Sequence, residues 1–252
     1  MGHNPTVTIS GLLVDAVDRI LPSTAPDPAA IWPGILLLVV VLAMPTARRW
    51  GRAAVTVIHE AGHAGVGILV GRRFEGFTVD ARLGGRAVTS GRSRGPGRIA
   101  TAWAGYPVPA LIGCLLVQAA LGGWVGPILT LALIAELVLL IKSRSARTLG
   151  LVLLVIAATA ALWWAGSSVM WVGPLALAPR DALTAGAGLV LLLGAWDALH
   201  DVAASRDPHQ DHGSLAGLTG LPGWFWLGTW WLVIAAATAW SAWRLVRGAG
   251  WV

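Results

Sequence analysis

Seven long apolar segments dominate this sequence and constrain what the chain can fold into. They cover residues 30–47, 52–71, 98–121, 124–142, 148–166, 182–202 and 222–243, and each approaches the ~20 residues that a helix needs to cross a bilayer. Hydrophobic residues make up 56% of the 252 residues and charged residues 12%, whereas a soluble domain carries about 25% charged residues. We therefore predict an all-α polytopic membrane protein with about seven transmembrane helices in a lipid bilayer.

The basic residues lie in short clusters between the apolar segments. Such clusters are typical of membrane topology signals and not of a nucleic-acid-binding face, so the formal charge of +6 predicts no nucleic-acid partner. A cytoplasmic N-terminus puts twelve Lys and Arg residues inside and six outside, which favours this orientation in the plasma membrane. The outer group includes Arg48, Arg49 and Arg52 between the first two spans, and this trio favours the opposite orientation.

Three regions differ from the apolar segments. Residues 1–29 predict an N-terminal segment with a short amphipathic helix at residues 7–21, followed by a turn-rich linker. Residues 30–247 then form a single transmembrane domain. Residues 167–180 contain Gly173, Pro174 and Pro179 and are too broken to count as a span, so they predict a re-entrant or interfacial piece.

Residues 73–93, after the second span, have the alternating pattern of a strand. Phe77, Val79 and Leu83 alternate with polar or small residues, Gly84-Gly85 offers a tight turn, and residues 87–90 provide a return. This pattern predicts a small re-entrant β-hairpin, with an ordinary basic loop as the alternative.

The second span contains a five-residue motif that points to a metal site. His59 and His63 are four residues apart in His59-Glu60-Ala61-Gly62-His63, so on a helix both imidazoles reach one metal ion from the same face. Glu60 is then placed to take a proton from water that the metal activates. Three ionisable residues inside a membrane span are costly, and a polar helix–helix contact explains them less well than metal binding does.

A catalytic zinc ion usually takes three protein ligands, so one further residue is needed. The candidates cluster late in the chain and are Asp197, His200, Asp201, Asp207, His209, Asp211 and His212. A helix N-cap is the alternative role for Asp211, and a contact to a neighbouring helix is the alternative for Asp197. The spacing alone does not choose among these carboxylates.

At this point the chain resembles a known family, the site-2 protease family of intramembrane zinc metallopeptidases, and in particular its short bacterial branch without soluble domains. The resemblance covers roughly residues 50–235. It rests on the His59–His63 motif in an apolar span, the following Gly-rich hairpin region, and Ala104-Gly105-Tyr106-Pro107 at the next span. A late motif of that branch has an Asp, then Leu four, Thr eight and Pro eleven residues on, which here are Asp211, Leu215, Thr219 and Pro222.

The resemblance implies a set of site residues. Asp211 would be the third zinc ligand, with Asp201 and then Asp197 as alternatives, and Gly105 and Pro107 would contact substrate. The family's Gly-Pro motif usually ends in an Asn that supports substrate, but the matching place here is near Ala110. An amide contact of that kind is therefore not expected in this chain.

The function implied is a zinc metalloendopeptidase that hydrolyses peptide bonds of transmembrane protein substrates near the cytoplasmic face, as in regulated intramembrane proteolysis. Zn²⁺ is the expected cofactor and Glu60 the catalytic base. The main alternative is a catalytically inactive relative that binds membrane proteins as a scaffold module. A transporter with pathway carboxylates at Glu136, Asp181 and Asp197 lacks the expected inverted repeat, and a purely structural scaffold leaves the histidine motif unexplained.

Overall fold

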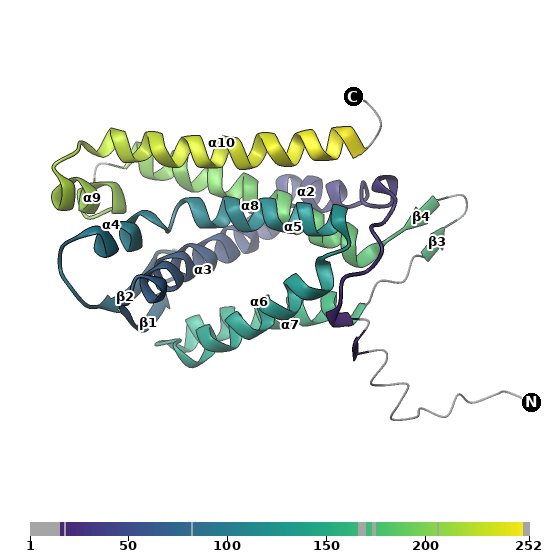
Figure 1. Ribbon diagram of the computed structural model, residues 1–252, viewed down its shortest axis with the longest axis horizontal. Coiled ribbons are helices and arrows are strands. Elements are labelled where there is room, and N and C mark those ends of the chain that lie inside the picture. The colour runs from purple at the N-terminus through teal and green to yellow at the C-terminus, as the bar shows by residue number, and fades with distance from the viewer. Residues whose placement is uncertain are drawn as a thin grey trace, which may run out of the picture.

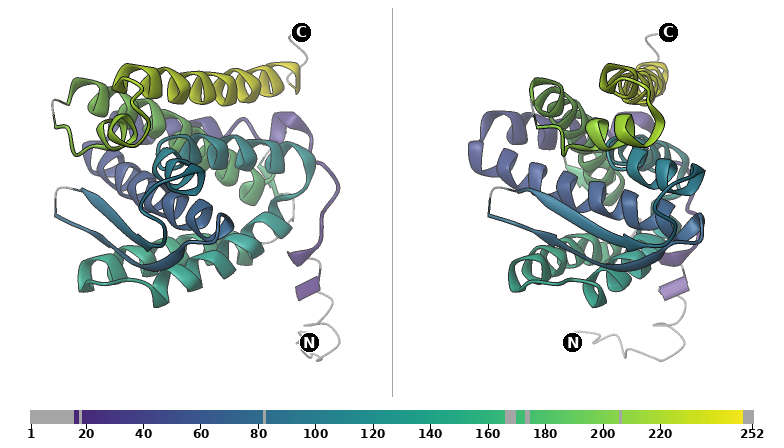
Figure 2. Two further views of the ribbon diagram at one scale, coloured as in Figure 1. Left: turned by 60° about the vertical axis from the view of Figure 1, so that its left-hand side comes forward. Right: turned by 90° about the vertical axis from the view of Figure 1, so that its left-hand side faces the viewer.

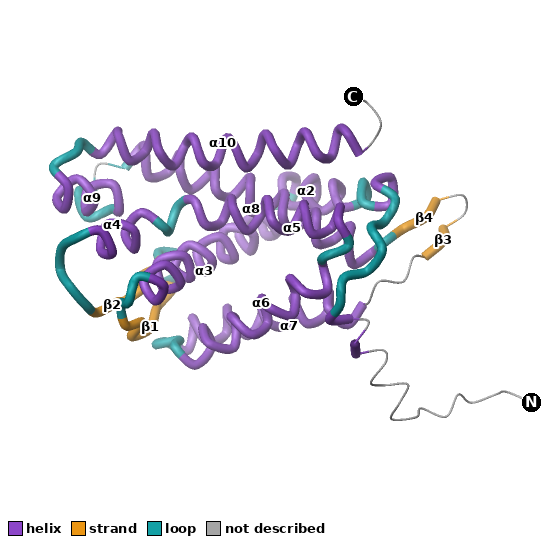
Figure 3. The backbone as a smooth tube through the Cα atoms, viewed as in Figure 1, coloured by secondary structure: helices purple, strands orange, loops and turns teal. Residues whose placement is uncertain are grey.

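A computed structural model describes residues 16–17, 19–81, 83–165, 170–172, 175–205 and 207–248 of the chain. The described part is a helical bundle with two small β-hairpins (Figures 1 and 3). In chain order its elements are the 3₁₀ helix η1 (Pro28–Ala30), α2 (Gly34–Ala43), α3 (Pro45–Leu69), β1 (Arg73–Val79), β2 (Gly85–Ser90), α4 (Pro96–Trp103), α5 (Pro107–Gly122), α6 (Val125–Ile141), α7 (Ala146–Ala165), β3 (Met170–Val172), β4 (Leu175–Leu177), α8 (Pro179–Ala204), α9 (Asp211–Thr219) and α10 (Gly223–Gly248).

The helix α8 lies at the centre of the bundle. α2, α3, α5 and α10 all pack against it (Figure 1). Gly34 of α2 and Gly186 of α8 approach each other's backbone so closely that neither position has room for a methyl group, and the same holds for Gly113 of α5 and Gly188 of α8. Contacts between small residues are typical of helix packing inside membranes. This packing therefore agrees with the membrane protein that the composition predicts.

The described helices give the protein several membrane spans. α7, α8 and α10 are each long and apolar enough to cross a bilayer, and the count rises to five if each of two bent helix pairs is one span. These pairs are η1–α2 with α3, bent by 105°, and α4 with α5, bent by 63°. The chain is thus a largely helical, polytopic membrane protein as predicted, but the number of about seven spans is not confirmed among the described residues.

The boundary between the first two predicted spans lies at Pro45 and not at residues 48–51. α2 has only 10 residues, about half of what a spanning helix needs, and α3 continues without a break from Pro45 to Leu69. Pro45 begins α3 because proline is tolerated in the first turn of a helix, where its missing N–H is not needed. Arg48, Arg49 and Arg52 therefore belong to α3, and their predicted position between two spans is wrong.

The third predicted span, residues 98–121, is broken into two helices. α4 ends at Trp103 and α5 begins at Pro107, and the chain changes direction between them. Pro107 occupies the first turn of α5, where it costs no hydrogen bond. The break brings the segment from Ala104 to Tyr106 alongside α3, with consequences for the site described below.

The predicted hairpin after the second span is confirmed. β1 and β2 pair antiparallel, with Phe77 opposite Ala87 and Val79 opposite Gly85. Figure 2 shows the hairpin between α3 and the α6–α7 pair. On the side of β1 away from β2, the N–H of Phe77 donates to the carbonyl of Lys142 at 3.1 Å and its carbonyl accepts from the N–H of Arg144 at 3.0 Å. The chain between α6 and α7 therefore occupies the outer edge of β1.

Two other predictions are only partly tested. The predicted interfacial piece at residues 167–180 contains the short antiparallel strands β3 and β4 and the start of α8. The predicted amphipathic helix at residues 7–21 lies mostly outside the described residues, and the linker leads into η1 at Pro28.

Candidate metal centre

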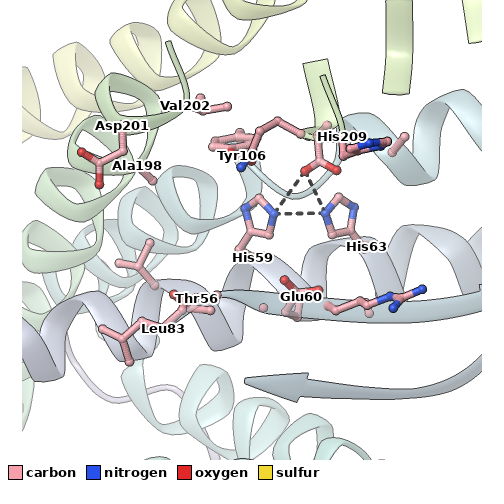
Figure 4. A pocket seen from close by; sticks show the side chains of 18 of the residues that line it. Thr56, His59, Glu60, His63, Leu83, Tyr106, Ala198, Asp201, Val202 and His209 are labelled. Atoms are coloured by element: carbon pink, nitrogen blue, oxygen red, sulfur yellow. Dashed lines mark hydrogen bonds and ion pairs between the residues drawn. The ribbon is translucent and has the colours of Figure 1, made fainter. Parts of the chain in front are cut away.

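His59 and His63 lie in the middle of α3 with their rings on the same side of the helix, as their spacing predicts. Their Nε2 atoms are 3.1 Å apart. The two side chains are 17% and 12% exposed, so both rings are turned into the protein and not toward lipid (Figure 4). One helical turn thus presents two imidazole nitrogens to a single point.

Asp211, the first residue of α9, supplies a third donor atom. Its Oδ2 lies 3.3 Å from Nε2 of His59 and 3.2 Å from Nε2 of His63. Leu215, one turn later, is fully buried in the apolar cluster shared with α5, α8 and α10, and this packing fixes α9 over the two histidines. Burial alone would raise the pKa of Asp211, but its contacts with the two imidazoles outweigh burial and hold the pKa below its usual range.

The donor set and its spacing fit a tetrahedral metal ion. Donor atoms of His59, His63 and Asp211 all lie within 4.8 Å of one another. Zinc–ligand distances of ~2.0–2.1 Å separate tetrahedral donors by about 3.3 Å, and the three separations here are 3.1, 3.2 and 3.3 Å. A methyl group on Gly105 would lie 2.5 Å from Nε2 of both histidines, so the glycine keeps the space beside these nitrogens open.

Contacts from the broken helix orient the two imidazoles. Nδ1 of His63 lies 2.7 Å from the backbone carbonyl of Thr101 on α4, and donation to this carbonyl leaves Nε2 free to bind a metal. The ring of His59 lies edge-on to Tyr106, with centroids 4.7 Å apart. Tyr106 in turn stacks on Trp230 of α10 at 4.4 Å. The break between α4 and α5 is therefore part of the site.

Glu60 lies beside the cluster and is almost fully buried, with 3% of its surface exposed. Its carboxylate lies against Gly85 at the start of β2, close to the backbone of Ala87. Figure 4 shows Glu60 between the histidines and the hairpin strand. A buried carboxylate beside two imidazoles is an arrangement suited to proton transfer.

The two alternative carboxylates lie apart from this cluster. Asp197 forms an ion pair with Arg48 at 2.8 Å, and Asp201 forms one with Arg52. Both pairs join α8 to α3, and only the second pair lines the cavity described below. In the part of the chain that the structure describes, the only group of side chains spaced to hold a metal ion is His59, His63 and Asp211.

The cluster opens into a cavity of about 760 Å³. α3, β2, α4, the end of α8 and the segment before α9 form its walls, and residues of both charges line it. The basic side chains on its wall are Arg52, Arg86 and Arg98. A cavity of this size accommodates several residues of an extended peptide.

The structure also clarifies the roles of the Ala104–Pro107 motif. Gly105 packs against the imidazoles and Pro107 is buried at the start of α5, whereas the cavity wall is formed by Tyr106. Substrate contact by Gly105 and Pro107 stays a prediction. The sequence predicts no role at the site for Tyr106, and for Gly85 only a role in the hairpin turn. The position of Tyr106 beside Gly105 in the motif was an available signal, whereas the approach of Gly85 to Glu60 depends on the packing of β2 on α3.

Comparison with known proteins identifies the family. A model of the family described as Peptidase M50B-like matches residues 32–241, which include the hairpin and all three members of the cluster. Searches of curated proteins and of solved structures gave no match. The family is one of membrane metallopeptidases, and the three-residue cluster is compatible with its dependence on a metal. The chain therefore belongs to the peptidase M50B-like family, in agreement with its resemblance to the site-2 proteases.

Proposed function

We propose that this protein is an intramembrane zinc metalloendopeptidase that hydrolyses peptide bonds of transmembrane protein substrates near the cytoplasmic face of the plasma membrane. One observation carries the proposal: two imidazoles and a carboxylate converge within 4.8 Å beside the buried Glu60. This combination supports a hydrolytic metal site of the His-Glu-x-x-His type.

His59, His63 and Asp211 would hold the zinc ion. When bound, the ion supplies a Lewis acid that acidifies water and polarises the scissile carbonyl. Glu60 then accepts a proton from the attacking water and delivers it to the departing amine nitrogen. The buried position of Glu60 beside the two imidazoles supports this role, because a general base must lie close to the water that it deprotonates.

The edge of β2 away from β1 supports a way to hold the substrate. Phe77 directs its N–H and carbonyl away from β2, so the opposite residue Ala87 directs its own away from β1. Gly85 and Ala87 line the cavity, so their polar groups are available to a peptide that joins the hairpin as a further strand.

The proposed orientation rests on charge. The connection from α3 to α4 carries many arginines, and it lies next to the cavity. Positively charged loops are retained on the cytoplasmic side of membranes. Cleavage is accordingly expected near that side, where water reaches the cavity.

Cleavage in liposomes tests the proposal. We expect the purified protein to bind about one zinc ion and to release products from a library of quenched fluorescent single-span peptides. Glu60→Gln is expected to keep zinc and to lose activity by about 10²- to 10⁴-fold, the usual contribution of a general base. Glu75→Gln makes the same chemical change at an exposed residue of β1 and serves as the matched control.

Each other result has a clear meaning. Normal cleavage by Glu60→Gln excludes this residue as the base. Zinc binding without any product from the wild-type protein contradicts the proposed activity and favours the alternative of an inactive relative that binds membrane proteins.

A further inference from the structure

Tyr106 lies on the wall of the cavity between the metal centre and α10. It is 8% exposed, and its ring is held between the edge of His59 and the face of Trp230. Figure 4 shows it beside His59 on the side of the cluster opposite Glu60. A group in this place meets the substrate from the side that the proposed base does not occupy.

The hydroxyl of Tyr106 has no hydrogen-bond partner among the described residues. Buried tyrosines normally satisfy their hydroxyl with a protein group or with water. Because Tyr106 lines the cavity, its O–H remains available to a molecule that enters it. The proposed proton transfer by Glu60 does not use this unpaired hydroxyl, although the hydroxyl belongs to a residue that contacts the candidate metal centre.

Peptide hydrolysis needs a donor at this kind of position. Attack of water converts the scissile carbonyl oxygen into an oxyanion, and preorganised hydrogen-bond donors that meet this charge lower the barrier. On the basis of the function proposed above, we propose that Tyr106 is a further catalytic residue whose hydroxyl donates a hydrogen bond to that oxygen.

The reaction balances without any change at Tyr106. A bond forms between the water oxygen and the carbonyl carbon, and the bond from that carbon to nitrogen breaks. One proton of the water passes through Glu60 to the departing nitrogen, and the new carboxyl group keeps the oxygen. Tyr106 keeps its own proton throughout and contributes only the hydrogen bond.

Trp230 is a positioning residue for this hydroxyl. Its indole N–H donates to the backbone carbonyl of Trp103 at 2.9 Å, and its side chain is fully buried. The indole thus forms a fixed platform on which the ring of Tyr106 stacks. A rigid donor loses little energy to reorganisation when charge develops on the substrate.

The substitution Tyr106→Phe removes the hydroxyl and keeps both ring contacts. We expect kcat to fall by about 100-fold, as for the loss of one oxyanion donor, with KM and zinc content close to those of the wild-type protein. Thr159→Val removes a hydroxyl from α7, where it contacts Glu136, and serves as the control. An unchanged kcat in Tyr106→Phe overturns the inference, and so does a loss that disappears when zinc content is equalised.

A binding measurement tests the same contact without turnover. Phosphinic peptides imitate the tetrahedral intermediate and its charged oxygen. Their affinity for Tyr106→Phe is expected to be lower than for the wild-type protein, by a factor similar to the fall in kcat. The chain has a single tyrosine, so 3-fluorotyrosine labels position 106 alone. Its ¹⁹F resonance is expected to shift when a phosphinic peptide is added to the zinc-loaded protein, and an unchanged resonance contradicts the proposed contact.

The two proposals fail in different ways. If the wild-type protein cleaves peptides, Glu60→Gln does not, and Tyr106→Phe is fully active, only the role of Tyr106 is wrong. If the wild-type protein cleaves nothing, the proposed function fails and the role of Tyr106 fails with it.

Discussion

The carboxylate of Glu60 lies directly against the α-carbon of Gly85, the first residue of β2. A side chain at position 85 would collide with Oε1 of Glu60. The motif on α3 and the hairpin are therefore fitted to each other at one point, and the absence of a side chain there sets where the proposed base lies.

Gly85→Ala is expected to displace the carboxylate of Glu60 and to lower the cleavage rate by more than about 10-fold, because a general base must lie within hydrogen-bonding reach of its proton. The zinc content should stay that of the wild-type protein. Gly65→Ala on α3 meets open space and is the matched control. Full activity of Gly85→Ala, measured as cleavage per bound zinc, contradicts this role for Gly85.

Gly105→Ala is expected to affect zinc binding, which Gly85→Ala should leave unchanged. The added methyl group lies 2.5 Å from Nε2 of His59 and of His63, so we expect zinc binding itself to be lost. Metal analysis after dialysis against a known zinc concentration measures this loss. Gly228→Ala on α10, where nothing lies near the added methyl group, controls for the general effect of the change. Retention of one zinc ion by folded Gly105→Ala would show that the ion lies elsewhere.

Substitution of the three carboxylates one at a time identifies the third ligand. Asp211→Asn is expected to weaken zinc binding by more than about 100-fold, since loss of a direct ligand should exceed the 10- to 100-fold effect of an outer contact. Asp197→Asn and Asp201→Asn break ion pairs with Arg48 and Arg52 and should leave zinc affinity nearly unchanged. Zinc loss in Asp201→Asn alone would assign the ligand to Asp201.

Backbone methylation of a substrate peptide tests pairing with β2. In an added strand, alternate residues direct their N–H groups to the hairpin. Methylation of these nitrogens is expected to raise KM by about 10-fold or more, whereas methylation of the nitrogens between them has little effect. A scan of single N-methyl positions along one cleaved peptide gives the measurement. The same KM at every position would exclude strand pairing.

The histidine motif was predictable because it is local. A helix places His59 and His63 on one face whatever surrounds it, and the alternation around Phe77 predicts a strand in the same local way. The role of Asp211 was harder to predict, because seven residues late in the chain were candidates for the third zinc ligand. Its place depends on the packing of α9 through Leu215, so only the family resemblance pointed to it before the structure did.

The spans were harder to predict than the site. Arg48, Arg49 and Arg52 suggest a loop because charges are costly in lipid, yet α3 continues through them, and α8 supplies Asp197 and Asp201 as partners for two of the three. The sequence contains both halves of each ion pair about 150 positions apart, and hydropathy does not reveal that they meet. The change of direction before Pro45 likewise depends on how α2 packs on α8.

Phe77 donates its backbone N–H to the carbonyl of Lys142 and accepts from the N–H of Arg144, so the outer edge of β1 is occupied. An added strand can then pair only along β2, so the protein's own backbone, and not the side chains of the substrate, sets where the substrate lies relative to the histidines. Substrates would then be selected mainly by how readily one end of a membrane helix unwinds. Local instability of the substrate helix would matter more for cleavage than a consensus sequence.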